Sequence, residues 1–370
     1  MRAVVFEEFG GSVDVRTVDD PVPSPGGVVV EVHATGLCRS DWHAWAGHDD
    51  GVALPHVPGH ELVGVIVAIG AEVRRWTVGE RVTTPFVCGC GRCEWCQGGQ
   101  AQVCPDQTQP GFTHWGSFAE YVALHAADTN LVAVADVVGD AAAAGLGCRF
   151  ATAYRALNAR ARVRRGEWVT VVGVGGVGLS AVQIAVAAGA RVIAVDRTEA
   201  ALALARSLGA EHTLLAGQGE RSDGGRHQGE RSDGGRHRGE RSDVAAQVHE
   251  LTGGGSHVAV DAVGTPATCA AAIHSLRRRG RHVQVGLLPS VGGHPAVPMD
   301  RVIAWELDVL GSHGMASVDY PDMLRLVEEG TLRPQALVER VVGMAEGARL
   351  LPSVDAASPV GVTLIDPRLS

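Results

Sequence analysis

Four cysteines in one short segment form the clearest chemical pattern in the sequence. Their spacing is C-x2-C-x2-C-x7-C, the residues between them are mostly glycine and polar, and the four are Cys90, Cys93, Cys96 and Cys104. Four thiolates complete the tetrahedral coordination of Zn²⁺, and two-residue gaps let a tight loop wrap one ion. Such a closed site leaves no position for a substrate, so it predicts a structural zinc ion.

Other interpretations of these cysteines remain open. Cys88 could replace Cys90 in a slipped register, although Cys90 keeps the regular spacing. Redox-active thiols and a zinc ribbon that binds nucleic acid are further alternatives. Nucleic-acid binding needs a clustered basic surface, whereas the net charge of the chain at pH 7 is −9. We therefore expect no nucleic-acid partner.

A second set of possible metal ligands is spread over three segments. In chain order the candidates are Cys38 in GLCRSDWH, His60 and Glu61 in PGHE, and Cys148 in GLGC. Each alone could be an ordinary core residue, because single cysteines and histidines are often buried without a ligand. Their neighbours raise their interest: Cys38 is followed within five residues by groups that can exchange protons, namely Ser40, Asp41 and His43.

A glycine-rich segment, VTVVGVGGVGLSAVQIA at Val169–Ala185, contains the pattern G-x-G-x-x-G. The first glycine allows a tight turn, the second lets a pyrophosphate approach the backbone, and the third lets a helix pack on a sheet. The phosphates would meet the first amides of a helix that begins near Val177. The residues expected to contact the cofactor here are Gly173, Gly175, Gly176, Val177 and Gly178.

Asp196 stands at the end of the next apolar run, Arg191–Val195. Its carboxylate should accept hydrogen bonds from the adenosine ribose and repel a 2′-phosphate, which favours NAD over NADP. Arg197 leaves NADP open, because an arginine there can pair with that phosphate. We expect Arg197 to lie against the adenine instead.

The elements that must position these groups change in character along the chain. Up to about residue 130, short apolar runs between Gly/Pro turns indicate β-strands at Ala3–Phe6, Val28–His33, Leu62–Ile69, Arg81–Thr84 and Phe118–Leu124. From about Cys148, strand-like runs alternate with helical segments, which predicts a doubly wound parallel sheet. Its strands are expected at Trp168–Val172, Arg191–Val195, His257–Asp261, His282–Val285 and Leu307–Gly311, and its helices at Gly178–Ala188, Glu199–Leu208 and Ala267–Leu276.

Two further segments need an interpretation. GERSDGGRHQ, GERSDGGRHR and GERSD follow one another from Gly219 to Asp243 without an apolar side chain, so we expect a disordered surface insertion. Val169–Ala190 lacks charge and is long enough to span a membrane, but its glycines favour a strand, a turn and a helix. The chain begins without the apolar core of a signal peptide. We expect a cytoplasmic protein with no membrane partner, in which grouped cysteines bind metal.

In this order, GLCRSDWH, PGHE, the four-cysteine segment, GCRFATAY and GVGGVG make the sequence resemble the zinc-containing medium-chain alcohol dehydrogenases. The resemblance covers nearly the whole chain apart from the repeat. It implies an α/β protein with a GroES-like, mainly β catalytic domain and a Rossmann cofactor domain. The implied boundaries are 1–149 with a structural-zinc lobe at about 88–105, 150–311 with the insertion at 217–243, and a return to the catalytic domain at 312–370.

The resemblance also implies two zinc ions per chain. Cys38, His60 and Cys148 would hold the catalytic zinc and leave one position open. Glu61 would be either a carboxylate behind the ligands or a transient fourth ligand. Asp41 would accept the free ring N–H of His60 and so orient it.

For the reaction, the resemblance implies reversible NAD-dependent oxidation of a primary or secondary alcohol to an aldehyde or ketone, by hydride transfer from a zinc-bound alkoxide. Ser40 would take the hydroxyl proton and pass it through the cofactor ribose to His43. Arg39 would lie near the pyrophosphate and Thr152 near the nicotinamide. Many members carry a Gly-Arg pair where this chain has Gly361-Val362, so any phosphate or carboxylate contact from that arginine is missing or supplied elsewhere.

The substrate is a small molecule, and its class stays open. Polyol, threonine and formaldehyde dehydrogenases belong to the same family, while a zinc-free quinone reductase of this fold and a non-catalytic zinc-binding scaffold are alternatives of another kind. Aromatic residues near the ligand segments favour an apolar alcohol; they are Trp42, Trp45, Phe86, Trp115 and Phe118. The family forms homodimers or homotetramers, and Leu307–Gly311 is the expected edge strand of the assembly.

Overall fold

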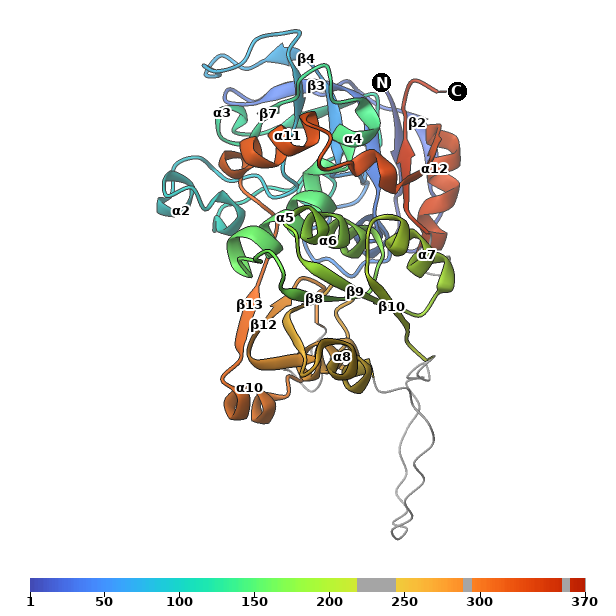
Figure 1. Ribbon diagram of the computed structural model, residues 1–370. Coiled ribbons are helices and arrows are strands. Elements are labelled where there is room, and N and C mark those ends of the chain that lie inside the picture. Colours follow the sequence, from blue (N-terminus) through green and yellow to red (C-terminus); the bar gives the residue numbers. More distant parts are fainter. Residues whose placement is uncertain (218–243, 289–294, 355–359, 370) are drawn as a thin grey trace.

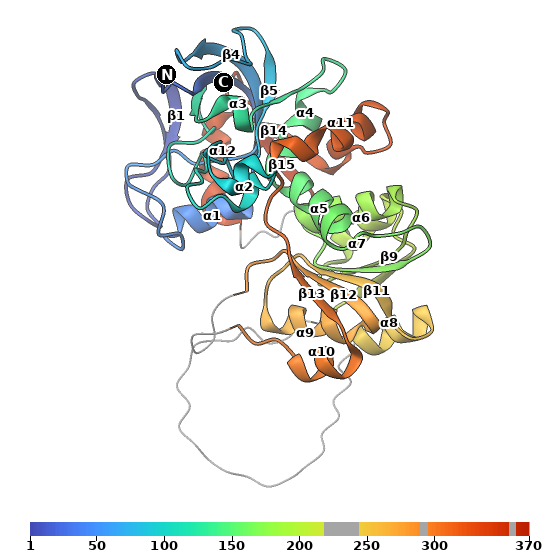
Figure 2. The same cartoon turned by 90° about the vertical axis from the view of Figure 1, so that its left-hand side faces the viewer.

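The structure is a computed structural model that describes residues 1–217, 244–288, 295–354 and 360–369. Figures 1 and 2 show two lobes, one holding β3, β4 and both ends of the chain, and the other holding β8 to β13. The repeat expected to form a disordered insertion lies outside the described residues. Among the described helices, none combines the length and apolar character needed to cross a bilayer.

The cofactor-type lobe is built on a parallel six-stranded sheet in the order β10-β9-β8-β11-β12-β13. Its strands are β8 (Trp168–Val172), β9 (Arg191–Asp196), β10 (His212–Leu215), β11 (Ser256–Asp261), β12 (Leu276–Gln284) and β13 (Asp308–Gly311). Its helices are α6 (Gly176–Ala187), α7 (Glu199–Ser207), α8 (Val244–Thr252), α9 (Pro266–His274) and α10 (Met299–Trp305). Every residue of β8 is buried, as expected for a central strand of a parallel sheet. The doubly wound fold is therefore confirmed.

The strand expected at His282–Val285 begins earlier than the sequence pattern indicated. β12 starts at Leu276 and pairs there with Ser256 of β11. The first part of the strand contains three exposed arginines, Arg277–Arg279. Backbone pairing forms the strand there, and no apolar pattern in the sequence marks it.

The other lobe contains a seven-stranded sheet in the order β14-β15-β3-β4-β5-β7, with β6 also paired to β3. Its strands are β3 (Val28–Leu37), β4 (Leu62–Ile69), β5 (Arg81–Thr83), β6 (Tyr121–Leu124), β7 (Val132–Ala133), β14 (Val338–Val342) and β15 (Val362–Ile365). A separate pair joins β1 (Arg2–Val5) and β2 (Asp14–Thr17). Because β15 pairs with β3, the C-terminal segment lies against the first sheet.

Short helices complete the fold. They are α1 (Arg39–Trp45), α2 (Glu94–Gln97), α3 (Ala127–Asn130), α11 (Tyr320–Glu328), α12 (Met344–Leu350) and the 3₁₀ turns η1 (Ala101–Val103), η4 (Ser317–Asp319), η5 (Pro334–Leu337) and η6 (Leu351–Ser353). α1 follows directly on β3, so it begins at the point where the longest strand of the first sheet ends.

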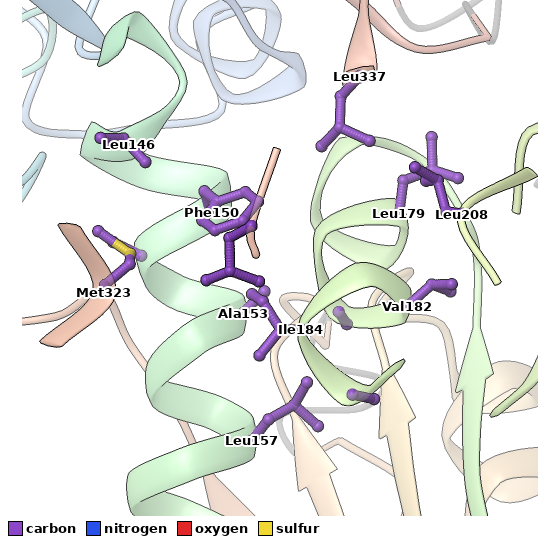
Figure 3. Close-up of a cluster of buried hydrophobic side chains, with 14 of the residues drawn as sticks. Leu146, Phe150, Ala153, Leu157, Leu179, Val182, Ile184, Leu208, Met323 and Leu337 are labelled. Carbon is purple, nitrogen blue, oxygen red and sulfur yellow. The ribbon is translucent and has the colours of Figure 1, made fainter. Parts of the chain in front are cut away.

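A helical stretch connects the two lobes. It runs through α4 (Asp140–Ala144), the π-helical turn η2 (Leu146–Phe150), α5 (Ala151–Arg155) and the π-helical turn η3 (Ala156–Arg160). Its apolar stripe consists of Leu146, Phe150, Ala153 and Leu157. Figure 3 shows Phe150, Ala153 and Leu157 on the side that faces α6, where Ile184 points toward them. The spacing of the stripe is that of one helix face. The domain boundary predicted between residues 149 and 150 falls inside this stretch and stays a prediction.

Candidate active site and structural metal centre

Cys38, His60 and Cys148 come together with their ligand atoms within 4.8 Å of one another. Cys38 follows the last residue of β3 and is the N-cap of α1, and His60 stands just before β4, whose Leu62 pairs with Thr35 of β3. Cys148 arrives on the π-helical turn η2. A Cβ on Gly147 would lie 2.8 Å from the carbonyl oxygen of Thr84, so a glycine is needed for this turn to approach the sheet so closely.

His60 is completely buried and is oriented by Asp41. Its Nδ1 lies 2.9 Å from Oδ1 of Asp41, which also accepts the N–H of Gly59 at 3.1 Å. The other carboxylate oxygen accepts the N–H of Cys38 at 2.8 Å. His60 Nε2 is buried without a hydrogen-bond partner in the described part of the chain. An orphaned imidazole nitrogen beside two thiols is costly without a ligand and fits a zinc ion.

The two thiols of this site shift each other's pKa in opposite directions. The hydrogen bond from Cys148 lowers the pKa of Cys38 well below its ordinary value, and the same interaction raises the pKa of Cys148 well above it. Burial works to lower the pKa of His60, but Asp41 and Cys38 outweigh it and raise that pKa. One thiolate is therefore favoured at this site, and a bound zinc ion would displace the remaining protons.

Arg149, which the sequence reasoning did not single out, forms a buried ion pair with Glu61. Its backbone N–H and its Nε donate to Glu61 Oε1 at 2.8 and 2.9 Å, and its Nη2 lies 2.6 Å from Oε2. Burial raises the pKa of Glu61, and Arg149 opposes that shift. Both carboxylate oxygens thus lie close to Arg149, but Oε2 makes no hydrogen bond in the described part of the chain, so both roles expected for Glu61 stay predictions. One feature of the sequence could have indicated its importance: Arg149 is the only charged residue in the segment GLGCRFATA, whose other residues are mostly small or apolar.

The four clustered cysteines bring their sulfur atoms within 4.8 Å of one another. This set consists of Cys90, Cys93, Cys96 and Cys104. Cys88 lies apart from it, buried against Thr84 and the carbonyl of Pro85, and burial raises its pKa to about 11. Two hydrogen-bonded contacts join this four-cysteine segment to the rest of the protein. Asn130 accepts from the N–H of Gly89 and donates to its carbonyl oxygen, and Gln100 Oε1 accepts a 2.7 Å bond from Arg155.

The groups expected to move protons lie on α1. Ser40 Oγ is 3.8 Å from Cys38 Sγ, and His43 follows three residues later, on the same helix face. Nδ1 of His43 lies 3.0 Å from Nδ1 of His48, an exposed residue. A serine hydroxyl and two imidazoles thus lie along the way from the ligand set to the surface.

The glycine-rich turn has the geometry that its sequence requires. Gly173 has a φ of +83°, a conformation that favours glycine. A Cβ on Gly178 would lie 1.8 Å from the carbonyl oxygen of Gly173, so no larger residue fits there. Gly175 caps α6, Gly176 is its first residue, and Val177 is the second.

Asp196 lies beside this turn. Its Oδ2 accepts the N–H of Val174 at 2.9 Å, and its Oδ1 accepts the N–H of Thr198 at 3.0 Å. Arg197 is exposed. Elsewhere around the site, Arg39 is the exposed first residue of α1, and Thr152 is buried with a hydroxyl that lacks a partner in the described part of the chain.

The aromatic residues divide into those beside the ligand set and those in the core. Phe86 and Phe112 lie next to His60, with ring centroids 6.1 and 5.2 Å from its ring. Phe112 was not anticipated from the sequence. Phe118, by contrast, is fully buried in a hydrophobic cluster. Trp115 donates its N–H to the carbonyl of Pro55 and is partly exposed.

Comparison with known proteins identifies relatives of both lobes. Residues 24–136 match the family model of the alcohol dehydrogenase GroES-like domain, and residues 176–329 match that of the zinc-binding dehydrogenases. The alcohol dehydrogenase of Geobacillus stearothermophilus is 33% identical over 337 residues, which cover 90% of each chain.

Solved structures share the whole architecture. A structure of an NAD-dependent alcohol dehydrogenase superposes with a TM-score of 0.83 at 29% identity and covers 99% of both chains. The alcohol dehydrogenase TADH from Thermus sp. ATN1 superposes with a TM-score of 0.84, also at 29% identity and 99% coverage of both chains.

Proposed function

The chain belongs to the zinc-containing medium-chain alcohol dehydrogenase family, and from this premise we propose which of its residues carry the reaction. The protein is an NAD- and zinc-dependent enzyme that oxidises small-molecule alcohols to aldehydes or ketones, and the reaction is reversible. One observation carries the residue assignment: three donors from distant segments converge in a buried site where His60 Nε2 has no partner.

We propose that Cys38, His60 and Cys148 hold the catalytic zinc, and that the four clustered cysteines hold the structural one. Bound zinc supplies a Lewis acid for the substrate oxygen, and NAD supplies the hydride acceptor. Asp41 keeps the proton of His60 on Nδ1, so that Nε2 points unprotonated toward the two thiols. The rings of Phe86 and Phe112, which lie beside His60, would exclude water from the catalytic zinc site.

The proton of the substrate hydroxyl leaves through α1. Ser40 Oγ lies 3.8 Å from Cys38 Sγ and would accept that proton. His43 and its partner His48 extend toward the surface and would release the proton to solvent. This order of groups matches a general-base path that starts at two half-buried residues, Ser40 and His43, and ends at the exposed His48.

The dinucleotide would bind at the start of α6. Gly173, Gly175 and Gly178 keep the turn free of side chains, so the backbone can approach the pyrophosphate. Asp196 at the end of β9 favours NAD, because its carboxylate would repel the 2′-phosphate of NADP. Thr152 offers an unpartnered hydroxyl for the nicotinamide end.

We further propose that the enzyme is a homodimer or homotetramer that assembles through β13, the last strand of the parallel sheet. Apolar side chains are exposed there and on α10: Val309 is 44% exposed, Met299 51% and Ile303 73%. Exposed apolar surface of this kind marks protein–protein contacts. Light scattering on the purified protein measures the assembly directly.

The decisive experiment combines zinc counting with an activity screen. Primary, secondary and aryl alcohols are offered with NAD and with NADP. We expect about two zinc ions per chain and reduction of NAD by at least one alcohol class. Protein without zinc would indicate a quinone reductase instead, and zinc-loaded protein that reduces no cofactor with any alcohol would indicate a scaffold.

A further inference from the structure

Arg149 joins the three segments that carry the candidate ligands of the catalytic zinc. It follows Cys148 directly, and its guanidinium holds the carboxylate of Glu61, which follows His60. Its Nη2 also donates to the carbonyl oxygen of Leu37 at 3.0 Å, and Leu37 precedes Cys38. The residues next to the three ligands, Leu37, Glu61 and Arg149, are therefore joined to one another through the Arg149 guanidinium.

One nitrogen of this guanidinium is left over. Nε and Nη2 serve Glu61 and Leu37, whereas Nη1 makes no hydrogen bond to any residue in the described ranges. The side chain is only 6% exposed, so Nη1 is not an ordinary solvated surface group. A guanidinium offers five N–H donors in a rigid fork, and its unused edge is suited to a phosphate.

That edge points at the glycine-rich turn. A Cβ on Gly176 would lie 3.1 Å from Nη1 and 2.9 Å from Cδ of Arg149, so the guanidinium packs on the first residue of α6. α6 is 12 residues long and starts with backbone N–H groups that favour an anion. The positive end of a helix and the unused Nη1 of a buried, ion-paired guanidinium thus face the same spot.

We propose that Arg149 binds the pyrophosphate of the dinucleotide through Nη1 while it holds Glu61 and Leu37, and so couples cofactor binding to retention of the catalytic zinc. The inference rests on the proposed function, because it places the dinucleotide at α6. Gly36 leaves room for this arrangement, since a Cβ there would lie 2.3 Å from Glu61 Oε2 and 3.2 Å from Nη2 of Arg149. Coupling between two ligands is reciprocal, so NADH and zinc should strengthen each other's binding by one common factor.

The first test is the affinity of zinc-loaded protein for NADH and for ADP-ribose, measured by fluorescence and calorimetric titration. Arg149→Met should raise the Kd of both ligands about 10- to 100-fold, the loss expected for a charge-assisted hydrogen bond to a phosphate. Arg149→Lys keeps the charge but not the fork, so its Kd should rise by a smaller factor. Arg155→Met is the matched control, because Arg155 is another buried arginine of the same helical stretch and pairs with Asp319.

The second test needs no turnover. The rate at which a chelator removes the catalytic zinc is measured with and without NADH. NADH should slow this removal in the wild type and in Arg155→Met, and should lose most of that effect in Arg149→Met and Arg149→Lys. A purely structural role for Arg149 would change the rate without changing its response to NADH.

The outcomes distinguish the proposed function from the role of Arg149 in it. Wild-type protein that binds neither NADH nor ADP-ribose contradicts the proposed function itself. Wild-type binding together with an unchanged Kd in both Arg149 variants overturns only the role of Arg149. An Arg155→Met protein that loses as much affinity as Arg149→Met also overturns it, because the effect would then come from any lost buried arginine.

Discussion

The two metal centres differ in how their donors reach one another. The four-cysteine centre takes all its donors from the segment between Cys90 and Cys104, most of which is exposed or half-buried. The other centre collects Cys38, His60 and Cys148 from the end of a strand, the entry to a second strand and a π-helical turn. One centre is local in sequence, and the other exists only when segments from distant parts of the chain are folded against one another.

This contrast explains why their surroundings differ. The local centre is mostly exposed or half-buried, so we expect its shape to depend on a bound metal. The non-local centre is held by buried partners, with Asp41 on His60 and Arg149 on Glu61. A π-helical turn, as at Cys148, is a rare element often found at functional sites. Removing the metal should therefore lower the stability of the fold at the first centre and abolish turnover at the second.

The largest effect on turnover is expected for Cys38→Ser. Loss of this donor removes the Lewis acid, which contributes several kcal/mol to the transition state, so kcat/KM should fall by about 1,000-fold or more. Zinc should drop from about two ions per chain to about one, while the thermal midpoint changes little. Metal analysis and thermal denaturation check these outcomes. A variant that keeps more than about a tenth of the activity contradicts the assignment of Cys38.

Cys93→Ser should have the opposite profile. A structural zinc ion contributes on the order of 10 kcal/mol of binding free energy, so losing a thiolate should lower the free energy of unfolding by several kcal/mol. Denaturant unfolding and zinc counting measure the change. Cys88→Ala is the control, since this thiol lies outside the cluster and its loss should leave both zinc ions in place. If the Cys93→Ser protein were as stable and as well assembled as the wild type, the structural-zinc assignment would be wrong.

Asp41→Asn sharpens the comparison by weakening only the non-local centre. The amide has no charge and only one accepting oxygen, whereas both oxygens of Asp41 accept hydrogen bonds, from Cys38 on one side and from Gly59 and His60 on the other. Partners of this kind change metal affinity by roughly 10- to 100-fold. Chelator competition should therefore show one zinc ion per chain that is lost more easily and one that is unaffected. Equal weakening of both ions would show that the two centres are not independent.

The smallest effect is expected for Gln100→Ala, which cuts the link between the four-cysteine lobe and the helical stretch. Arg155 keeps its bond to Asp319, so the free energy of unfolding should fall by only about 1 to 2 kcal/mol. Zinc content should stay at two ions. A large loss of activity in this variant would mean that the lobe acts on the active site more directly than its contacts suggest.

The fold was predictable where the signal is local. The apolar runs Leu62–Ile69 and Trp168–Val172 are β4 and β8 with the bounds expected from the sequence, because continuous apolar stretches between turns are typical of buried strands. β10 and α10 were missed: β10 has one buried residue among four, and α10 has none. Elements of this kind depend on backbone pairing and on packing against neighbours, which leave little trace in local periodicity.

The candidate site divides in the same way. The sequence alone determined the candidate donors, their order along the chain and the glycine turn before α6, since these follow from residue type and short spacing. The departure at Gly361-Val362 indicated that a carboxylate or phosphate contact was absent or moved. Only the tertiary structure decided that both oxygens of Glu61 face Arg149 and that Nη1 of Arg149 points at Gly176. Such contacts depend on how a strand, a loop and a helix from distant parts of the chain pack together, and no local pattern specifies that geometry.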